Sequence, residues 1–369
     1  MPPADEKLEL LVDGAAYAGW KSVSVTRSLE TISGAFSLEV SDRWSGQARP
    51  WPIPPGARCE IRIGAETVLT GWVDEMNPSF SSSERSLTVT GRDATGDLVD
   101  CSPEISPSEW ANLTLPQIVT RIAGDFGVKV AIENGAGMGG RFAKFTLQPG
   151  ETAFAAISRA CRMRAVLPVS DGVGGILLTR GGRKKAGDAL VQGENILSAS
   201  AGYSLKERFS TYIVKGQQAA TDQSYGAAAA HVRATAADEG VKRHRPLVII
   251  ASGDPDGGGS AQERARWEAI VRAGRSASAE MTVVGWRQST GELWQPGLLV
   301  PVKCPWLGMD SEMVVSSVQH KKSASGTTTA LSVTRPDAFT QMAKVPAQKD
   351  PWNMLARQVA PDLAAGGAP

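Results

Sequence analysis

Residues 56–94 contain the segments GARCEIRI, GWV and LTVTGRDA, and residues 297–338 contain GLLVPVKC, SSV and LSVTRPDA in the same order. In each stretch a strand pattern, a polar hairpin and a second strand pattern end in an arginine that is followed closely by Asp-Ala. Self-similarity of this kind predicts two related β modules within one chain. The alternative interpretation is that any two antiparallel hairpins share such a pattern.

The residues around the first stretch predict further strands. Apolar residues alternate with Ser, Thr, Glu or Arg at 23–25, 36–40, 59–63 and 87–89, and this period of two is typical of half-buried antiparallel strands. Turn residues such as Pro54-Pro55-Gly56 separate the strand patterns. The first hundred residues are therefore expected to form a barrel or a sandwich.

The pattern changes to a helical period after residue 100. Apolar residues from Leu115 to Phe126 recur at i, i+3, i+4 and i+7, and Thr114 forms a capping box with Gln117. A second helix is predicted over residues 152–163, and strand-like segments flank both helices. This part of the chain is therefore expected to be a small α/β domain. Strand patterns return after residue 185, interrupted by one further predicted helix.

The composition is that of a globular protein and limits the classes of function. The chain has 369 residues, of which 42% are hydrophobic and 21% are charged, so a sizeable core is expected. Its 39 basic and 38 acidic residues give a net charge of +1, which argues against a protein whose main function is to bind duplex DNA tightly. No apolar run approaches the roughly 20 residues of a membrane helix, and the first residues lack a secretory signal pattern. We expect no membrane insertion and reduced cysteines.

Motifs that carry chemistry are missing from the sequence. His231, His244 and His320 have no metal-ligand spacing, and no GxSxG, GxxxxGK[ST] or HExxH motif is present. We therefore expect no catalytic residue, no cofactor and no metal site. The alternative is a cell-wall hydrolase that uses carboxylates of the α/β region such as Glu133 or Glu151, which would require two carboxyl groups about 5–10 Å apart in a cleft.

The order and spacing of several motifs resemble those of one family. GWVD at 71–74, LTVTGRD at 87–93 and DLVDCS at 97–102 resemble the first-barrel signature of the contractile-tail baseplate hub proteins of Mu-like bacteriophages. Late-control protein D and the hub domains of type VI secretion spike proteins are more distant relatives. Further similar segments extend the resemblance over about residues 8 to 340: GETAF at 150–154, RPL at 245–247, MTVVGW at 281–286 and GELW at 291–294.

The resemblance, together with these patterns, implies a fold class that is mainly β with α+β. It consists of two tube-protein-like antiparallel β-barrels and a small α/β domain. The expected domains are a first tube-like β-barrel at 1–98, the α/β domain at 99–185, a second tube-like β-barrel at 186–342 with a helical insertion near 260–275, and a flexible C-terminal tail at 343–369.

The resemblance also implies a structural function and no enzymatic activity. Such a hub is expected to form a homotrimer whose two barrels per chain give a pseudo-hexameric ring. The ring would join the tail tube protein to the central membrane-piercing spike protein, contact other baseplate proteins and let DNA pass through its lumen. It would assemble in the host bacterial cytoplasm and reside in the tail baseplate of the virion. The alternative is the hub of a type VI secretion or phage-tail-like bacteriocin particle.

Eight residues of the matched motifs are expected to have structural roles: Gly71, Trp72, Asp74, Arg92, Asp93, Asp100, Gly285 and Trp286. Arg92 and Asp93 end a strand, where we expect them to pair with each other's neighbours or to cap the following turn. Gly71 and Gly285 are expected to permit a close approach of backbones or a bulge in the barrel wall. Trp286 is expected to anchor the second barrel.

Overall fold

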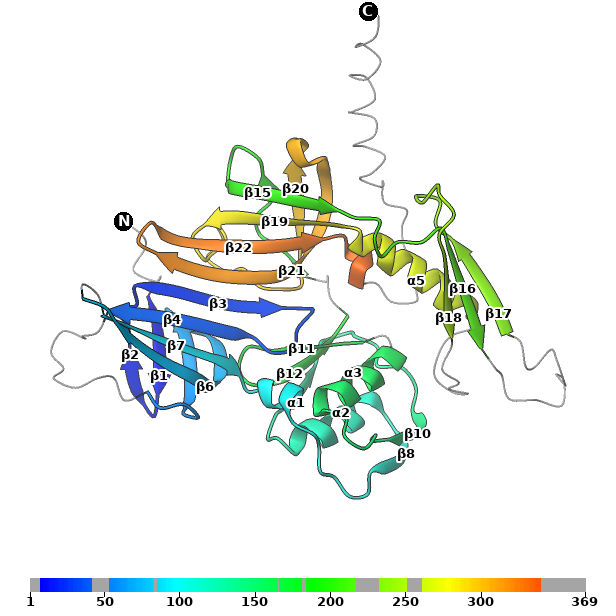
Figure 1. Ribbon diagram of the computed structural model, residues 1–369, viewed down its shortest axis with the longest axis horizontal. Helices are drawn as coiled ribbons and strands as arrows, with labels where there is room; N and C mark the ends of the chain where they lie inside the picture. The colour runs from blue at the N-terminus through cyan, green and yellow to red at the C-terminus, as the bar shows by residue number, and fades with distance from the viewer. Residues whose placement is uncertain are drawn as a thin grey trace, which may run out of the picture. The chain divides into compact units, whose positions relative to one another are not determined.

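The computed structural model describes residues 7–41, 53–82, 85–164, 166–180, 184–216, 232–250 and 261–339 (Figure 1). The predicted tail at 343–369 lies outside these residues. The chain divides into two compact units. The first unit comprises Met1–Arg180, Thr282–Pro296 and Ser316–Leu331, and the second comprises Gly181–Met281, Gly297–Val315 and Ser332–Pro369. The domain boundaries expected from the sequence stay a prediction.

An antiparallel sheet forms the N-terminal part of the first unit, and Figure 1 shows its strands side by side. These strands take the order β3-β4-β7-β6-β5-β1-β2 within a 14-stranded sheet of the described residues. The bounds are β1 Leu8–Val12, β2 Ala15–Tyr17, β3 Ser22–Ser28, β4 Ala35–Ser41, β5 Arg58–Ile63, β6 Glu66–Phe80 and β7 Arg85–Asp93. The predicted alternation is present in β5, where Cys59, Ile61 and Ile63 are buried and join one core cluster with Leu10 and Val89. The prediction of a mainly β, antiparallel fold is confirmed, and the closure of the sheet into a barrel stays a prediction.

Helices and short strands alternate in the rest of the N-terminal half. The bounds are α1 Gly96–Asp100, β8 Glu109–Leu113, α2 Leu115–Gly124, β9 Val130–Ile132, β10 Phe142–Thr146, α3 Ala153–Met163, β11 Leu167–Ser170 and β12 Ile176–Thr179. β10 pairs with β8, and β12 lies between β11 and β9. The predicted capping box of α2 is present, with Thr114 N donating to Gln117 Oε1 at 2.9 Å. At α3, Thr152 accepts a hydrogen bond from Ala155 N at 3.2 Å. The expected α/β character of this region is confirmed.

The second unit holds further strands and the longest described helix. The bounds are β13 Lys184–Lys185, β14 Leu190–Val191, β15 Ile196–Tyr203, β16 Thr211–Gly216, β17 Val232–Ala237, β18 Pro246–Ile250, α5 Ala261–Arg275, β20 Leu298–Cys304, η1 Pro305–Leu307 and η2 Pro336–Phe339. β16 pairs antiparallel with β17 and parallel with β18, and α5 contacts β16 and β17 (Figure 1). Three strands have residues in both units: β19 Ala277–Val284, β21 Met309–Ser323 and β22 Gly326–Thr334.

The predicted repeat is present in the order of the strands. In the N-terminal copy, β3 to β7 follow one another along the chain and take the sheet order β3-β4-β7-β6-β5. In the C-terminal copy, β15, β19, β20, β21 and β22 take the order β15-β19-β22-β21-β20, which is the same arrangement. The strand lengths correspond as well, since β6 and β21 both have 15 residues and β7 and β22 both have 9. Five strands in a shared order support the duplication of one module and argue against two unrelated hairpins.

Candidate functional site

Four of the expected motif residues lie opposite one another on β6 and β7. In the antiparallel register, Gly71 is opposite Asp93 and Trp72 is opposite Arg92. We call this place the β6–β7 junction. It lies at the end of β7, directly before the turn into α1, so it links the first sheet to the α/β region.

The two strands approach each other closely at the junction because two of its positions are glycines. A Cβ atom on Gly71 would lie 2.0 Å from the carbonyl oxygen of Arg92, and one on Gly91 would lie 2.2 Å from that of Trp72. The pairing of β6 with β7 shifts by one residue directly after Val73. A bulge bends a strand, and glycine inside a strand often marks a bulge or a close approach of another backbone. Any side chain at Gly71 or Gly91 would therefore displace the facing backbone.

Asp93 is the buried centre of the junction, with only 1% of its surface exposed. Its carboxylate accepts hydrogen bonds from Gly34 N at 2.8 Å, Thr95 N at 3.1 Å and Ser33 Oγ at 3.3 Å. Thr95 Oγ1 donates to the carbonyl of Ile32 at 3.0 Å. A buried carboxylate is stable only when its oxygens have partners. Asp93 thus fixes the turn between β3 and β4 to the turn between β7 and α1.

Arg92 binds two carboxylates on the exposed side of the junction. Its Nε lies 2.8 Å from Asp74 Oδ2, and its Nη2 lies 2.7 Å from Asp100 Oδ2. Hydrogen bonds to Asp100 and Asp74 raise the pKa of Arg92, and the bond from Arg92 lowers the pKa of Asp100. In the C-terminal copy, Pro336 takes the position of Arg92, and the neighbouring Arg335 pairs through Nη2 with Asp337 Oδ2 at 2.7 Å. Arg92 therefore connects β6 to the end of α1.

A second contact between the sheet and the α/β region is made by Arg27 of β3. Its Nη2 donates to the carbonyl of Ser170 at 3.1 Å. A Cβ atom on Gly172 would lie 2.7 Å from the guanidinium carbon, so a side chain there would displace the end of Arg27. Burial lowers the pKa of Arg27, while the charges of Asp93 and Asp171 act in the opposite direction. The two carboxylates thus offset only part of the cost of burying the arginine.

The remaining two motif residues, Gly285 and Trp286, lie just after β19. The chain turns at Gly285, whose φ is 73°. Trp286 is fully buried, and its Nε1 donates to the carbonyl of Lys321 at 2.8 Å. Trp286 belongs to the core cluster that the N-terminal strands form. Trp286 thus packs with the N-terminal strands while its indole bonds to β21 of the C-terminal copy, and the expectation that it anchors the second barrel stays a prediction.

His320 packs next to this tryptophan and is held neutral. The ring centroids of Trp286 and His320 are 6.3 Å apart in an edge-to-face arrangement. His320 Nδ1 lies 3.4 Å from the hydroxyl of Thr329. Burial, and then the positive charge of Arg27, lowers the pKa of His320 to about 3. At neutral pH this imidazole is an uncharged core residue. His231 lies outside the described residues, and His244 is exposed.

The two carboxylates considered for hydrolysis both have partners in the fold. Glu133 Oε2 accepts a hydrogen bond from Thr179 Oγ1 at 2.6 Å. Glu151 Oε1 accepts bonds from Gln148 N at 2.6 Å and from Arg159 Nη2 at 2.7 Å. These contacts fix a strand end and the turn before α3, which are structural roles.

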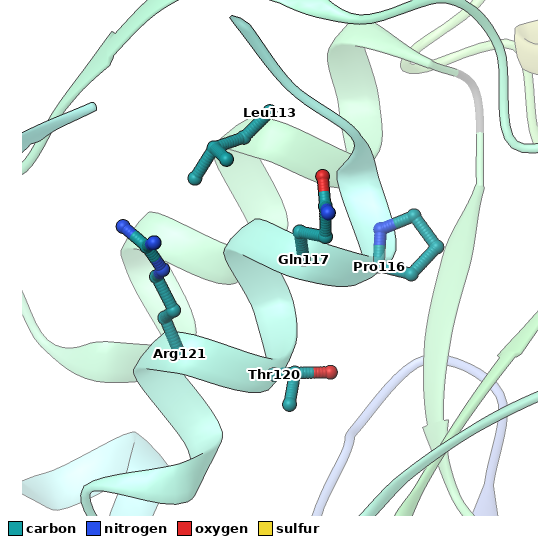
Figure 2. A pocket seen from close by; sticks show the side chains of 5 residues that line it. All are labelled: Leu113, Pro116, Gln117, Thr120 and Arg121. Carbon is teal, nitrogen blue, oxygen red and sulfur yellow. The ribbon is translucent and has the colours of Figure 1, made fainter. Parts of the chain in front are cut away.

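Two pockets lie in the first unit. One pocket has a volume of about 350 Å³. Figure 2 shows the side chains that line it, which are Leu113 of β8 and Pro116, Gln117, Thr120 and Arg121 of α2. A second pocket of about 150 Å³ is lined by Arg27, Asp171 and their neighbours.

Among the described residues, no three His, Cys, Asp or Glu side chains are grouped to hold a metal ion. No helix in the described part of the chain has the length and apolar character to span a membrane.

Sequence reasoning missed the roles of Arg27 and Gly91. An isolated glycine inside a strand pattern is a signal for close backbone approach, so Gly91 was detectable. The contact of Arg27 with Ser170 joins residues 143 positions apart, and no local pattern indicates it.

Three family models match successive parts of the chain. The N-terminal domain of the Mu phage baseplate assembly protein GpP-like family matches residues 7–93. The second domain of the baseplate hub protein gp44-like family matches residues 95–180. The fourth domain of the Mu phage baseplate assembly protein GpP matches residues 258–342.

Individual relatives show the same similarity over most of the chain. Baseplate hub protein gp44 of Escherichia phage Mu is 35% identical over 319 residues, which cover 84% of this chain and 82% of that protein. The crystal structure of the 43 kDa tail protein of prophage MuSo2 from Shewanella oneidensis has a TM-score of 0.80 and 35% identity, covering 90% of this chain and 99% of that one. The tail protein of Neisseria meningitidis MC58 shares the fold, with a TM-score of 0.76 and 21% identity over 90% and 98% of the two chains. The chain therefore belongs to the family of baseplate hub proteins of Mu-like phage tails.

Proposed function

We propose that three copies of this hub protein form a closed ring in which the two repeated modules of each chain occupy near-equivalent positions. The observation that carries the proposal is the five-strand order that occurs twice in the chain. Three chains with two like modules each present six like units. Such a ring matches a six-fold partner, although it contains three subunits.

In this proposal the ring joins two different structures of the tail. One face contacts the hexameric tail tube protein, and the other holds the central spike protein, with other baseplate proteins around it. DNA contacts the hub only in transit through the lumen. The net charge of +1 supports this, because a protein that held DNA tightly would carry a large basic excess.

Sedimentation velocity and negative-stain images of the purified hub test the ring. We expect particles of three chains with six lobes in projection. A protein that stays monomeric at high concentration, or a ring of six chains, would overturn the proposal. Binding of the tail tube protein of the same phage to the purified ring would support the proposed contact between the ring and the tube.

The same proposal places the hub in the tail baseplate of the virion after assembly in the host bacterial cytoplasm. The identity of 35% to the Mu hub favours a phage tail. Neighbouring genes provide the test: tube, sheath, spike and capsid genes together fit a phage. Tube and sheath genes without capsid genes would instead indicate a secretion or bacteriocin particle.

The proposed role includes no catalytic residue, cofactor or metal. The structural contacts of Glu133 and Glu151 support this role. Zymography on peptidoglycan is the test, and no clearing is expected. Clearing by the wild-type hub that is lost on Glu133→Gln or Glu151→Gln would overturn the structural proposal in favour of a hydrolase.

A further inference from the structure

The three-stranded sheet of the second unit has an unpaired edge at β18. Its strand order is β17-β16-β18, so β18 pairs only with β16 among the described strands (Figure 1). The carbonyl of Arg245, directly before β18, accepts a hydrogen bond from Ser210 N at 2.9 Å and therefore points to the β16 side. Backbone groups of successive residues point alternately to the two edges of a strand. Those of Pro246, Val248 and Ile250 thus point away from β16, to the unpaired edge.

The side chains along this edge are apolar and exposed. Val248 exposes 52% of its surface and Ile250 exposes 82%. The helix α5 contacts β16 and β17, and Tyr212 of β16 is fully buried on the side that α5 covers. Val248 lies on the other side of the sheet, because its partner in β16 is Ile213. An unpaired strand edge with exposed apolar side chains is a template for an added strand.

Positive charge lies at both ends of the unpaired edge. The residues before β18, Lys-Arg-His-Arg at 242–245, are called the basic turn. Its first three residues are exposed, and within the described part of the chain no carboxylate forms an ion pair with Lys242 or Arg243. Lys215, whose partner in β18 is Ile250, is exposed at the far end of the strand. A strand that pairs with this edge therefore meets cations at each end.

The fold holds the basic turn in place from both sides. Before the turn, the carboxylate of Asp238 accepts hydrogen bonds from Arg208 Nε at 2.6 Å and from Arg208 Nη2 at 2.9 Å, and both side chains are almost fully buried. At the end of the turn, Arg245 Nε donates to the carbonyl of Arg208 at 3.2 Å, and Arg245 Nη2 donates to that of Lys206 at 2.9 Å. The exposed cations between these anchors are thus preorganised for a partner, which lowers the entropy lost on binding.

We propose that the unpaired edge of β18 and the basic turn bind an extended acidic segment of a second protein, which adds a strand to this sheet. Apolar side chains at alternate positions of the segment cover Val248 and Ile250, and carboxylates on either side of them pair with the cations at the two ends. Backbone N–H and C=O groups beside apolar side chains match a peptide and not a phosphate chain. The inference names a further partner of the hub and holds for a ring or a single chain.

Two synthetic peptides test the charge preference. The acidic probe is Glu-Asp-Thr-Val-Thr-Val-Thr-Asp-Glu, and its neutral match carries Gln for Glu and Asn for Asp. In fluorescence anisotropy with the wild-type hub, the acidic probe should bind about tenfold more tightly than the neutral match. Equal affinities, or no binding of the acidic probe at about 1 mM, would overturn the proposal.

Paired substitutions locate the charge that the probe recognises. Lys242→Ser/Arg243→Ser should weaken binding of the acidic probe about fivefold, because two exposed charge pairs are lost. The control Arg58→Ser/Lys303→Ser removes two exposed cations of β5 and β20 and should leave the affinity unchanged. Equal effects of the two double variants would contradict the role of the basic turn.

Val248→Pro tests the added strand. The change removes an N–H that points away from β16, and the sheet should remain folded because Pro246 already occupies the same edge two residues earlier. Binding of the acidic probe should be abolished, whereas Val248→Thr, which keeps the N–H, should weaken it by about threefold or less. Circular dichroism and sedimentation compare the fold and association of each variant with wild type. Unchanged binding by folded Val248→Pro would reduce the site to a charged patch and overturn the strand pairing.

Hydrogen exchange of the wild-type hub needs no substitution. The amides of Val248 and Ile250 should gain protection when the acidic probe binds, whereas those of Leu247 and Ile249, which point to β16, should change little. Probe binding without this gain would contradict the added strand.

A single-stranded oligonucleotide of about 20 nucleotides is the competing ligand. If it displaced the acidic probe and bound more tightly, with the same loss of affinity in Lys242→Ser/Arg243→Ser, the site would belong to a nucleic acid and the peptide proposal would be wrong. All readouts use the hub in the oligomeric state that it has in solution, so a negative result here leaves the proposed ring untouched.

Discussion

The carboxylate of Asp93 accepts a 2.8 Å hydrogen bond from the backbone N–H of Gly34, although 59 residues separate them. Asp93→Ala should lower the free energy of unfolding by on the order of 3 kcal/mol, because the N–H groups of Gly34 and Thr95 would lose their buried acceptor. Urea unfolding measures the loss. The matched control is Asp97→Ala, at an exposed carboxylate four residues later, which should change stability by about 0.5 kcal/mol or less. Equal losses in the two variants would contradict the role of Asp93.

Gly71 is expected to tolerate no side chain. Gly71→Ala would place a methyl group 2.0 Å from the carbonyl oxygen of Arg92, so β6 and β7 would have to separate at a cost of about 3 kcal/mol or more. Thermal unfolding gives the measurement. Gly124→Ala is the control, since nothing lies within 4 Å of its Cβ position, and it should be neutral or stabilising by up to about 1 kcal/mol. An unchanged melting temperature for Gly71→Ala would show that the close approach is not rigid.

The bond from Arg92 to Asp100 predicts a change in titration. The pKa of Asp100 lies below its ordinary value of 3.8 because Arg92 bonds the charged form, and Arg92→Ala should return it to that value. The stabilisation is present above 3.8 and disappears as the pH falls through the lowered pKa. Because the pair is exposed, its contribution is about 1 kcal/mol or less. Carboxyl NMR of wild type, Arg92→Ala and the control Arg58→Ala measures the shift. A normal pKa in the wild type would contradict the pairing.

Because His320 is neutral in the fold, the free energy of unfolding should depend on pH. Its pKa is about 3 in the fold and about 6.5 in the unfolded chain, so the unfolded state binds the extra proton between these values. Stability should therefore fall as the pH decreases from 6.5 toward 3, by up to about 1.4 kcal/mol per pH unit from this group. Urea unfolding at several pH values should show a shallower slope for His320→Gln. The slope should be unchanged for His244→Gln, which alters an exposed histidine. Equal slopes in all three proteins would disprove the assignment.

Local patterns predicted most of the elements. The period of two in β5 and the capping box at Thr114 depend on neighbours within a few residues, so the sequence alone indicates them. The repeat was visible for the same reason, because the matched segments contain whole strands. The order of the strands in the sheet could not be predicted, because it depends on pairings between strands that are far apart in the sequence.

The sequence motifs identified several residues of the β6–β7 junction, but they did not indicate the partners that these residues contact. Arg92 and Asp93 were expected to act at a strand end, but their separate partners, Asp100 on one side and Gly34 on the other, come from different elements. The packing of Trp286 with the N-terminal strands was not predictable, because it joins segments that are far apart in the sequence. The predicted tail at 343–369 lies outside the described residues.

The two copies of the module differ in what connects their first two strands. β3 leads to β4 through residues 29–34, whereas the interval between β15 and β19 holds β16, β17, β18 and α5. Lengthening a surface connection costs little free energy compared with altering strand register. The longer connection between the first two strands of the C-terminal copy therefore adds a sheet and a helix and leaves the shared five-strand order unchanged.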